Sequence, residues 1–179
     1  MPGIITLLDD EFAARVRAVQ DAMASEFGIL RGYPGDLPHF TYHLSDSCDL
    51  DASAEVAARI SAAQARFTVS TSGFGVFTGA EVAIYVPIAR SDTLAALHRR
   101  ICEDMDAAGQ PNNPYYHPDR ALPHITIAQQ NLRAEAMPGV LAWLTTQDLS
   151  WNVPVTNLTL ADQTPFSARI IGRWAFHEG

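Results

Sequence analysis

The chain has 179 residues, of which 47% are hydrophobic and 18% charged, with a net charge of −8 and a pI near 5.0. This length fits one domain with a substantial core. The acidic balance argues against a protein that grips long nucleic acid, because such binding needs clustered cations. All twelve basic residues are arginine. The absence of lysine excludes a P-loop lysine, a Schiff base and an adenylylated lysine.

The N-terminal stretch and the cysteines bear on where the protein works. A short apolar run over 4–8 follows Met1, with no basic n-region and no stretch able to span a bilayer. Cys48 and Cys102 lack metal-ligand spacing and are too few for a disulfide framework. We therefore expect a cytoplasmic protein with free thiols and no membrane partner, and we also expect a monomer.

Apolar periodicity and capping residues predict the elements of the first half. Asp9 is the expected cap of a first long helix, and Gly28 is its expected end. A second helix is expected after a cap at Asp51 or Ser53. The remaining expected elements are strands over 4–8, from 39, and over 67–71, 74–78 and 82–88.

The same order of elements then recurs. Ser91 is the expected cap of a helix closed by Gly109, and a Pro-rich loop over 110–120 leads to a strand from 124. A shorter helix is expected near Pro138, with Leu141 and Leu144 buried. The last expected elements are longer strands over 149–160 and 166–176.

This recurrence indicates an internal duplication. We expect one α+β domain over 1–179, made of half-repeats 1–89 and 90–179. The predicted architecture is bilobal, with two pseudo-twofold-related lobes of antiparallel sheet and helices on the outside. The central cleft between the lobes is the expected ligand site.

Two six-residue stretches carry the same pattern. They read Leu-Pro-His-Phe-Thr-Tyr at 37–42 and Leu-Pro-His-Ile-Thr-Ile at 122–127, which places the two histidines 85 residues apart. A proline followed by alternating apolar and polar residues indicates a half-buried strand, in which side chains two apart share a face. We therefore expect His39 beside Thr41, and His124 beside Thr126, with the residues between them pointing into the core.

Two imidazoles and two hydroxyls together suit a phosphodiester. One histidine takes a proton, the other gives one, and the threonine hydroxyls donate to non-bridging oxygens. Histidine suits both tasks because its unperturbed pKa of roughly 6.5 leaves both protonation states accessible. The residues alone leave open whether His39 or His124 is the acid.

With these two motifs, the chain resembles the 2H phosphoesterase superfamily, also known as the 2'-5' RNA ligase or cyclic phosphodiesterase family. Its signature is two His-x-Thr/Ser-x motifs on strands, and the resemblance covers nearly the whole chain. It implies a metal-independent, cofactor-free enzyme that opens 2',3'-cyclic phosphates, or cleaves 2'-5' linkages, on RNA 3' ends or small nucleotides. His39 and His124 would be catalytic, and Thr41 and Thr126 would bind substrate. The resemblance leaves the substrate open.

Three further side chains are candidates for substrate binding. Arg120 lies four residues before His124 and suits a phosphate or a base. Tyr115 and Phe77 suit stacking on a nucleobase. The alternatives are an exposed loop for Tyr115, and core packing for Phe77 or its neighbour Phe74.

The other histidines have simpler interpretations. His43 shares the predicted face of His39, but the second motif has Ala128 at the matching position. We therefore expect His43 at the surface or at the rim of the site. We expect His98 to pack beside the apolar stripe of its helix and His177 to be solvated.

Three rival functions remain open at this point. The first is a nucleotide-binding module that keeps the cleft without turnover. The second is a metal hydrolase that uses His39, His43 and His124. The third is a general RNA-binding protein, which the acidic charge disfavours.

Overall fold

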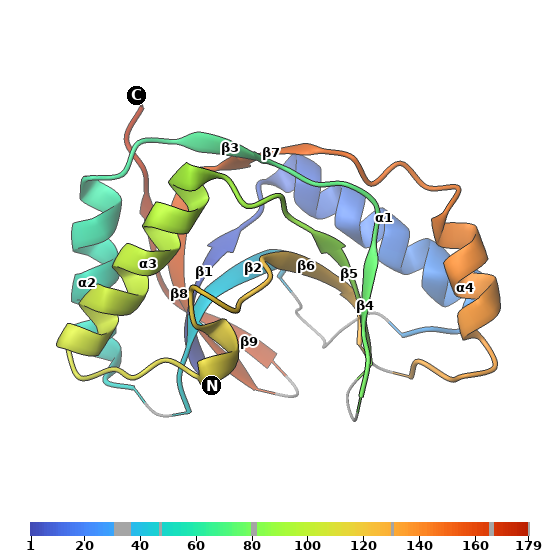
Figure 1. Cartoon of the computed structure of the whole chain (residues 1–179), viewed down its shortest axis with the longest axis horizontal. Helices are drawn as coiled ribbons and strands as arrows, with labels where there is room; N and C mark the ends of the chain where they lie inside the picture. Colours follow the sequence, from blue (N-terminus) through green and yellow to red (C-terminus); the bar gives the residue numbers. More distant parts are fainter. Residues whose placement is uncertain (31–36, 47, 80–81, 130, 165–166, 179) are drawn as a thin grey trace.

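The computed structural model describes residues 1–30, 37–46, 48–79, 82–129, 131–164 and 167–178. Its strands form an arch, with α2 and α3 on one side and α1 and α4 on the other (Figure 1). The helices are α1 (Asp10–Phe27), α2 (Leu50–Ala62), α3 (Asp92–Ala107), the 3-10 turn η1 (Pro114–Tyr116) and α4 (Met137–Leu144). The strands are β1 (Pro2–Leu7), β2 (His39–Leu44), β3 (Phe67–Ser70), β4 (Gly75–Phe77), β5 (Ala83–Pro87), β6 (His124–Ala128), β7 (Asn152–Val155), β8 (Asn157–Thr164) and β9 (Ser167–Ala175).

Two antiparallel sheets build the two lobes. One has the strand order β2-β1-β8-β9 and the other β4-β5-β6, while β3 and β7 form a separate two-stranded ribbon. The fold is therefore α+β and bilobal, as the sequence predicts. Each sheet takes strands from both halves of the chain, so the expected half-repeats 1–89 and 90–179 do not correspond to one sheet each.

The helices cross between the sheets. Helix α1, which joins β1 to β2, contacts β6 of the other sheet, and α3, which joins β5 to β6, contacts β2. Helix α2 covers β8 and β9, and α4 packs against α1. The two β-α-β units thus exchange helices, which ties the lobes together.

Local signals at helix ends are mostly as predicted. The Asp9 carboxylate accepts a hydrogen bond from the N–H of Phe12, and Gly28 ends α1 with φ of 69°, a conformation that glycine adopts without strain. Ser91 likewise caps α3. The cap of α2 is Asp49 rather than Asp51 or Ser53, because the Asp49 side chain accepts from the N–H groups of residues 51 and 52.

Two other predictions of the second half need correction. The expected strand over 149–160 is two strands, since β7 pairs with β3 and β8 pairs with β1, with a break at Thr156. The buried side of α4 is Val140 with Leu144, and Leu141 is only partly buried. The expected last strand over 166–176 is seen as β9, and Phe166 lies outside the described residues.

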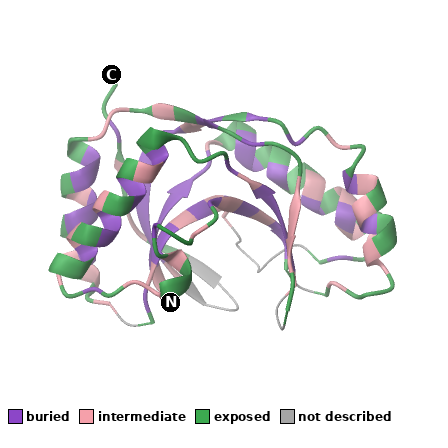
Figure 2. Ribbon diagram, in the orientation of Figure 1, coloured by how far each residue is buried: buried purple, intermediate pink, exposed green. Residues whose placement is uncertain are grey.

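One continuous core serves both lobes. Its cluster of buried apolar side chains includes Phe40 of β2 and Ile125 of β6, and Figure 2 shows burial concentrated on the strands and the inward helix faces. A second, smaller cluster contains Ile5, Leu7 and Ala161. Ile4 of β1 packs in the main core and the next residue, Ile5, packs in the smaller cluster, because successive side chains of a strand point to opposite faces.

Candidate active site

The two motif strands lie in contact across the two sheets. Strand β2 contacts β6, and Figure 1 shows them next to each other in the middle of the arch. The apolar residues of each motif are buried as predicted, Phe40 and Tyr42 in β2 and Ile125 and Ile127 in β6. The histidines and threonines are half-buried on the opposite face.

Both motif strands carry a β-bulge at the same place. On β2, Thr41 pairs with Ile5 and His43 with Ile4, so Tyr42 is the extra residue. On β6, Thr126 pairs with Tyr85 and Ala128 with Ile84, which leaves Ile127 extra. Because bulges redirect side chains, the alternation that places histidine and threonine on one face ends after the threonine in both strands.

Each motif histidine is held by its own backbone in the same way. The Nδ1 atom of His39 lies 2.5 Å from the carbonyl oxygen of Leu37, and Nδ1 of His124 lies 2.6 Å from that of Leu122. A carbonyl only accepts, so Nδ1 of each ring carries the proton. In the neutral ring Nε2 is then the basic nitrogen, and it is the atom that exchanges a proton.

The electrostatics of the two histidines are coupled. Burial lowers the pKa of His124, and the hydrogen bond to the Leu122 carbonyl acts in the opposite direction. Positive charge on His39, the smallest of the three causes, lowers this pKa further. Two like charges at short range disfavour the doubly protonated pair. The pair is therefore suited to hold a single proton.

The motif threonines share the face of the histidines. Within the described part of the chain, the hydroxyls of Thr41 and Thr126 make no hydrogen bond to protein. Each is therefore available to donate to an oxygen of a ligand.

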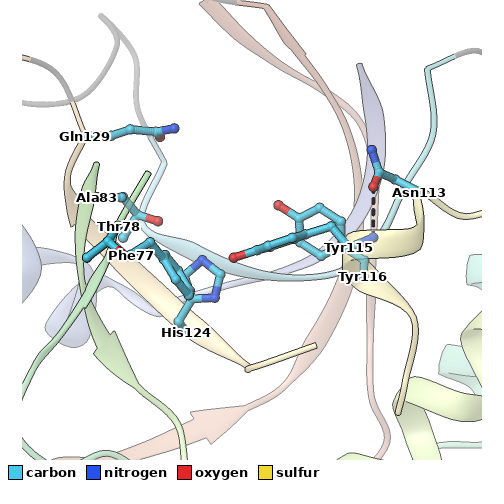
Figure 3. Close-up of a pocket in the computed structure, with 9 residues that line it drawn as sticks. Phe77, Thr78, Ala83, Asn113, Tyr115, Tyr116, His124 and Gln129 are labelled. Carbon is cyan, nitrogen blue, oxygen red and sulfur yellow. Dashed lines mark hydrogen bonds between the residues drawn. The ribbon is translucent and has the colours of Figure 1, made fainter. Parts of the chain in front are cut away.

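A cavity of about 370 Å³ opens beside the second motif. Figure 3 shows His124 and Phe77 on one side of it, with Tyr115 and Tyr116 opposite. The first motif residues His39 and Thr41 are not among its lining. The described residues that line it are Phe77, Thr78, Ala83, Asn113, Tyr115, Tyr116, His124, Thr126 and Gln129.

Aromatic rings surround His124. Phe77 stacks on Tyr85 with 4.1 Å between ring centroids, and the two meet the His124 ring edge-on at 4.9 and 5.3 Å. Tyr115 approaches Phe77 at 6.1 Å. The Tyr85 ring lies over Gly75, where a Cβ would clash with it, so a side chain at that position would displace the ring.

Sequence reasoning missed Tyr85, which reads as an ordinary strand residue. The signal that was available is the glycine opposite it, because a glycine inside a strand often marks close approach of another group. Phe74 packs against the core, whereas Phe77 lies at the site, which separates these two candidates.

The loop that carries Tyr115 and Tyr116 is fixed to β2. The N–H of Asn113 donates to the Leu44 carbonyl at 2.7 Å, and the Asn113 side chain accepts from the N–H of Tyr115. Nε2 of His98 donates to the carbonyls of Tyr42 and Tyr116. His98 is buried, as predicted, and it joins the motif strand to this loop.

The prediction of a rim position for His43 is wrong. His43 is 1% exposed and its Nε2 donates to the Gln110 carbonyl at 3.0 Å. The bulge at Tyr42 turns it to the core side, opposite Ile4. In the described residues no group of three or more His, Cys, Asp or Glu side chains is arranged to hold a metal, so His39, His43 and His124 do not form such a set.

Arg120 lies beside this cavity rather than in it. It lines a neighbouring cavity of about 450 Å³ together with Phe77, Pro114, Tyr115 and Leu122. Among the remaining predictions, His177 is exposed and both cysteines are free thiols.

The family model for the 2'-5' RNA ligase superfamily matches residues 8–165. The chain belongs to this superfamily. No curated protein matches the sequence.

Solved structures of this superfamily's fold align over nearly the whole chain. TT0787 of Thermus thermophilus is 14% identical with a TM-score of 0.71, covering 99% of this chain and 98% of that one. E. coli LigT in its apo form is 19% identical with a TM-score of 0.67, covering 99% and 97%. At these identities the likeness establishes the fold, which the 2H phosphoesterases share.

Within the described residues no helix combines the length and the apolarity needed to cross a bilayer.

Proposed function

We propose that this member of the 2'-5' RNA ligase superfamily hydrolyses 2',3'-cyclic phosphates, or 2'-5' phosphodiesters, of small nucleotides or RNA 3' ends without a metal. The observation that carries the proposal is the matched pair of imidazoles on two contacting motif strands, β2 and β6. His39 and His124 come from distant parts of the chain, yet the charge of one lowers the pKa of the other. Each has the same tautomer, fixed by a backbone carbonyl.

The reaction needs one base and one acid. The neutral histidine takes a proton from water as its oxygen bonds to phosphorus. The bond from phosphorus to one ribose oxygen breaks, and the protonated histidine gives its proton to that oxygen. Thr41 and Thr126 donate to the non-bridging oxygens, where negative charge shifts in the transition state.

The surroundings of His124 favour it as the base. Burial among aromatic rings and the neighbouring His39 both lower its pKa, so it is neutral at physiological pH. His39 then carries the proton that goes to the leaving oxygen.

The aromatic wall of the cavity suits a nucleobase. Phe77 and Tyr115 offer ring surfaces next to His124, and aromatic stacking accepts any base. Structures of E. coli LigT exist with 3'-AMP, NADP+ and ATP. Those ligands support a small nucleotide as the ligand class of this chain.

The test is a panel of phosphodiesters incubated in EDTA. We expect hydrolysis of 2',3'-cyclic mononucleotides or 2'-5' dinucleotides, and none of a 3'-5' DNA dinucleotide. The pH–rate profile should be bell-shaped, because one histidine must be neutral and the other protonated. Binding of a cyclic nucleotide without turnover would favour the non-catalytic module instead. Activity lost in EDTA and restored by zinc would favour a metal hydrolase.

A further inference from the structure

Two neighbouring cavities share two aromatic lining residues. Phe77 and Tyr115 line both the cavity that contains His124 and the neighbouring cavity of about 450 Å³. Their rings meet edge-on, with centroids 6.1 Å apart. His124 and Thr126 line only the first cavity, whereas Arg120 and Leu122 line only the second. The second cavity is thus next to the reacting groups without containing them.

The second cavity combines apolar surface with one cation. Leu122 is 43% exposed and Tyr115 is 52% exposed, so both offer apolar surface to a ligand in this cavity. Arg120 is exposed and makes no ion pair with a carboxylate of the described residues. Among the described residues that line either cavity, Arg120 alone carries a permanent positive charge.

The second cavity also contains a residue that positions the base of the proposed function. The carbonyl of Leu122 holds Nδ1 of His124, while the side chain of the same residue lines the second cavity. A group bound there therefore lies next to the segment that orients the proposed base.

We propose that the second cavity binds the nucleotide that precedes the reacting end. This inference rests on the proposed function and deepens it by naming the substrate as an oligonucleotide of at least two nucleotides with a 2',3'-cyclic phosphate end. Such an end has no nucleotide downstream, so a further base and phosphate come from the 5' side. The base contacts Tyr115 and Leu122, and Arg120 meets the one additional phosphate.

The experiment compares kcat/KM for a 2',3'-cyclic mononucleotide and for a dinucleotide that ends in the same cyclic nucleoside. We expect the dinucleotide to be favoured by roughly tenfold or more, from one stacked base and one phosphate contact. Arg120→Gln should lower kcat/KM for the dinucleotide much more than for the mononucleotide. Leu122→Ser should act in the same direction.

Salt dependence gives an independent readout. One phosphate contact should steepen the logarithmic salt dependence of the dinucleotide reaction by about 0.7, and Arg120→Gln should remove that difference. Arg17→Gln is the matched control, since Arg17 is exposed on α1 and lines neither cavity.

The outcomes distinguish the inference from the function beneath it. Equal kcat/KM for the two substrates, or an equal loss on both in Arg120→Gln, overturns the second subsite and leaves the phosphodiesterase intact. Failure to hydrolyse either cyclic substrate overturns the second subsite, and the proposed function is overturned with it only if 2'-5' dinucleotides are also left uncleaved.

Discussion

The two motif strands have the same backbone and different surroundings. β2 and β6 share the bulge position, and each histidine has its Nδ1 held by the carbonyl two residues earlier. The residues opposite the threonines differ, however: Ile5 faces Thr41 in an aliphatic cluster, whereas Tyr85 faces Thr126 in an aromatic one.

A symmetric backbone can thus serve two chemical roles. The backbone fixes both imidazoles in one tautomer, and in the mechanism that we propose the neighbouring side chains separate the base from the acid. On the β6 side the aromatic rings desolvate His124 and form a cavity wall. Single substitutions can test whether the β2 and β6 sides contribute equally to the rate of the reaction and unequally to the binding of substrate.

The largest expected effect is the loss of either histidine. His39→Ala and His124→Ala should each lower the rate of cyclic phosphate hydrolysis by roughly 10²–10⁴, because each removes one proton transfer. The double variant should cost less than the product of the two, since the residues act as a unit. Rates are measured in EDTA, with circular dichroism to confirm folding. A variant that keeps most of its activity removes that histidine from the mechanism.

Replacement of the threonines should have the next largest effect. Thr41→Val and Thr126→Val each remove one hydroxyl donor with little change in shape, and we expect losses of roughly 10²–10³ in kcat. Single-turnover kinetics provide the measurement. If one variant retains full kcat, only the other strand supplies an oxygen contact, and the symmetry of the two motifs ends at the histidines.

The third prediction concerns the aromatic side alone. Phe77→Leu should raise KM roughly 5- to 150-fold, the equivalent of the 1–3 kcal/mol that one stacked base contributes. Ile5→Val on the aliphatic side is the matched control and should change KM little. Equal effects of the two changes would contradict an aromatic base site.

The effect of His39 on the pKa of His124 can be measured directly. His39→Gln removes a nearby positive charge, so the pKa of His124 should rise toward its ordinary value. NMR titration of the His124 ring in the two proteins measures this shift. An unchanged pKa would leave burial as its sole cause and would weaken the case for a shared proton.

The smallest expected effect involves His43, whose matching residue on β6 is Ala128. Burial lowers the pKa of His43, so the unfolded chain binds its proton more readily than the folded one. Its contribution to stability is therefore complete above about pH 6.5 and is lost as the pH falls below that value. Urea midpoints at pH 8 and 5.5 should differ less in His43→Gln than in the unchanged protein. The exposed His177→Gln should keep the full difference.

Local signals predicted most of the fold, and tertiary contacts account for the rest. Asp9, Gly28 and Ser91 act within one turn of their helices, so capping rules locate those ends. The break at Thr156 exists because the flanking segments pair with two different strands, β3 and β1. No pattern within 149–160 encodes that choice of partners.

The site divides in the same way. Strand alternation is a local property, so the repeated motif predicts that His39 and His124 lie on the face opposite the buried apolar residues, and both do. The bulge that buries His43 depends on how β2 pairs with β1, and alternation alone gave the wrong face. Tyr85 lies against His124 where Gly75 on the neighbouring strand leaves room for its ring, and strand patterns do not show that contact.

The exchange of helices between the lobes limits how the molecule can move. The chain leaves one sheet for α1 against the other, returns through β2, and repeats the crossing at α3. Among the described segments, none by itself therefore serves as a hinge about which one lobe swings away from the other. The separation of the two imidazoles should therefore stay nearly constant throughout turnover.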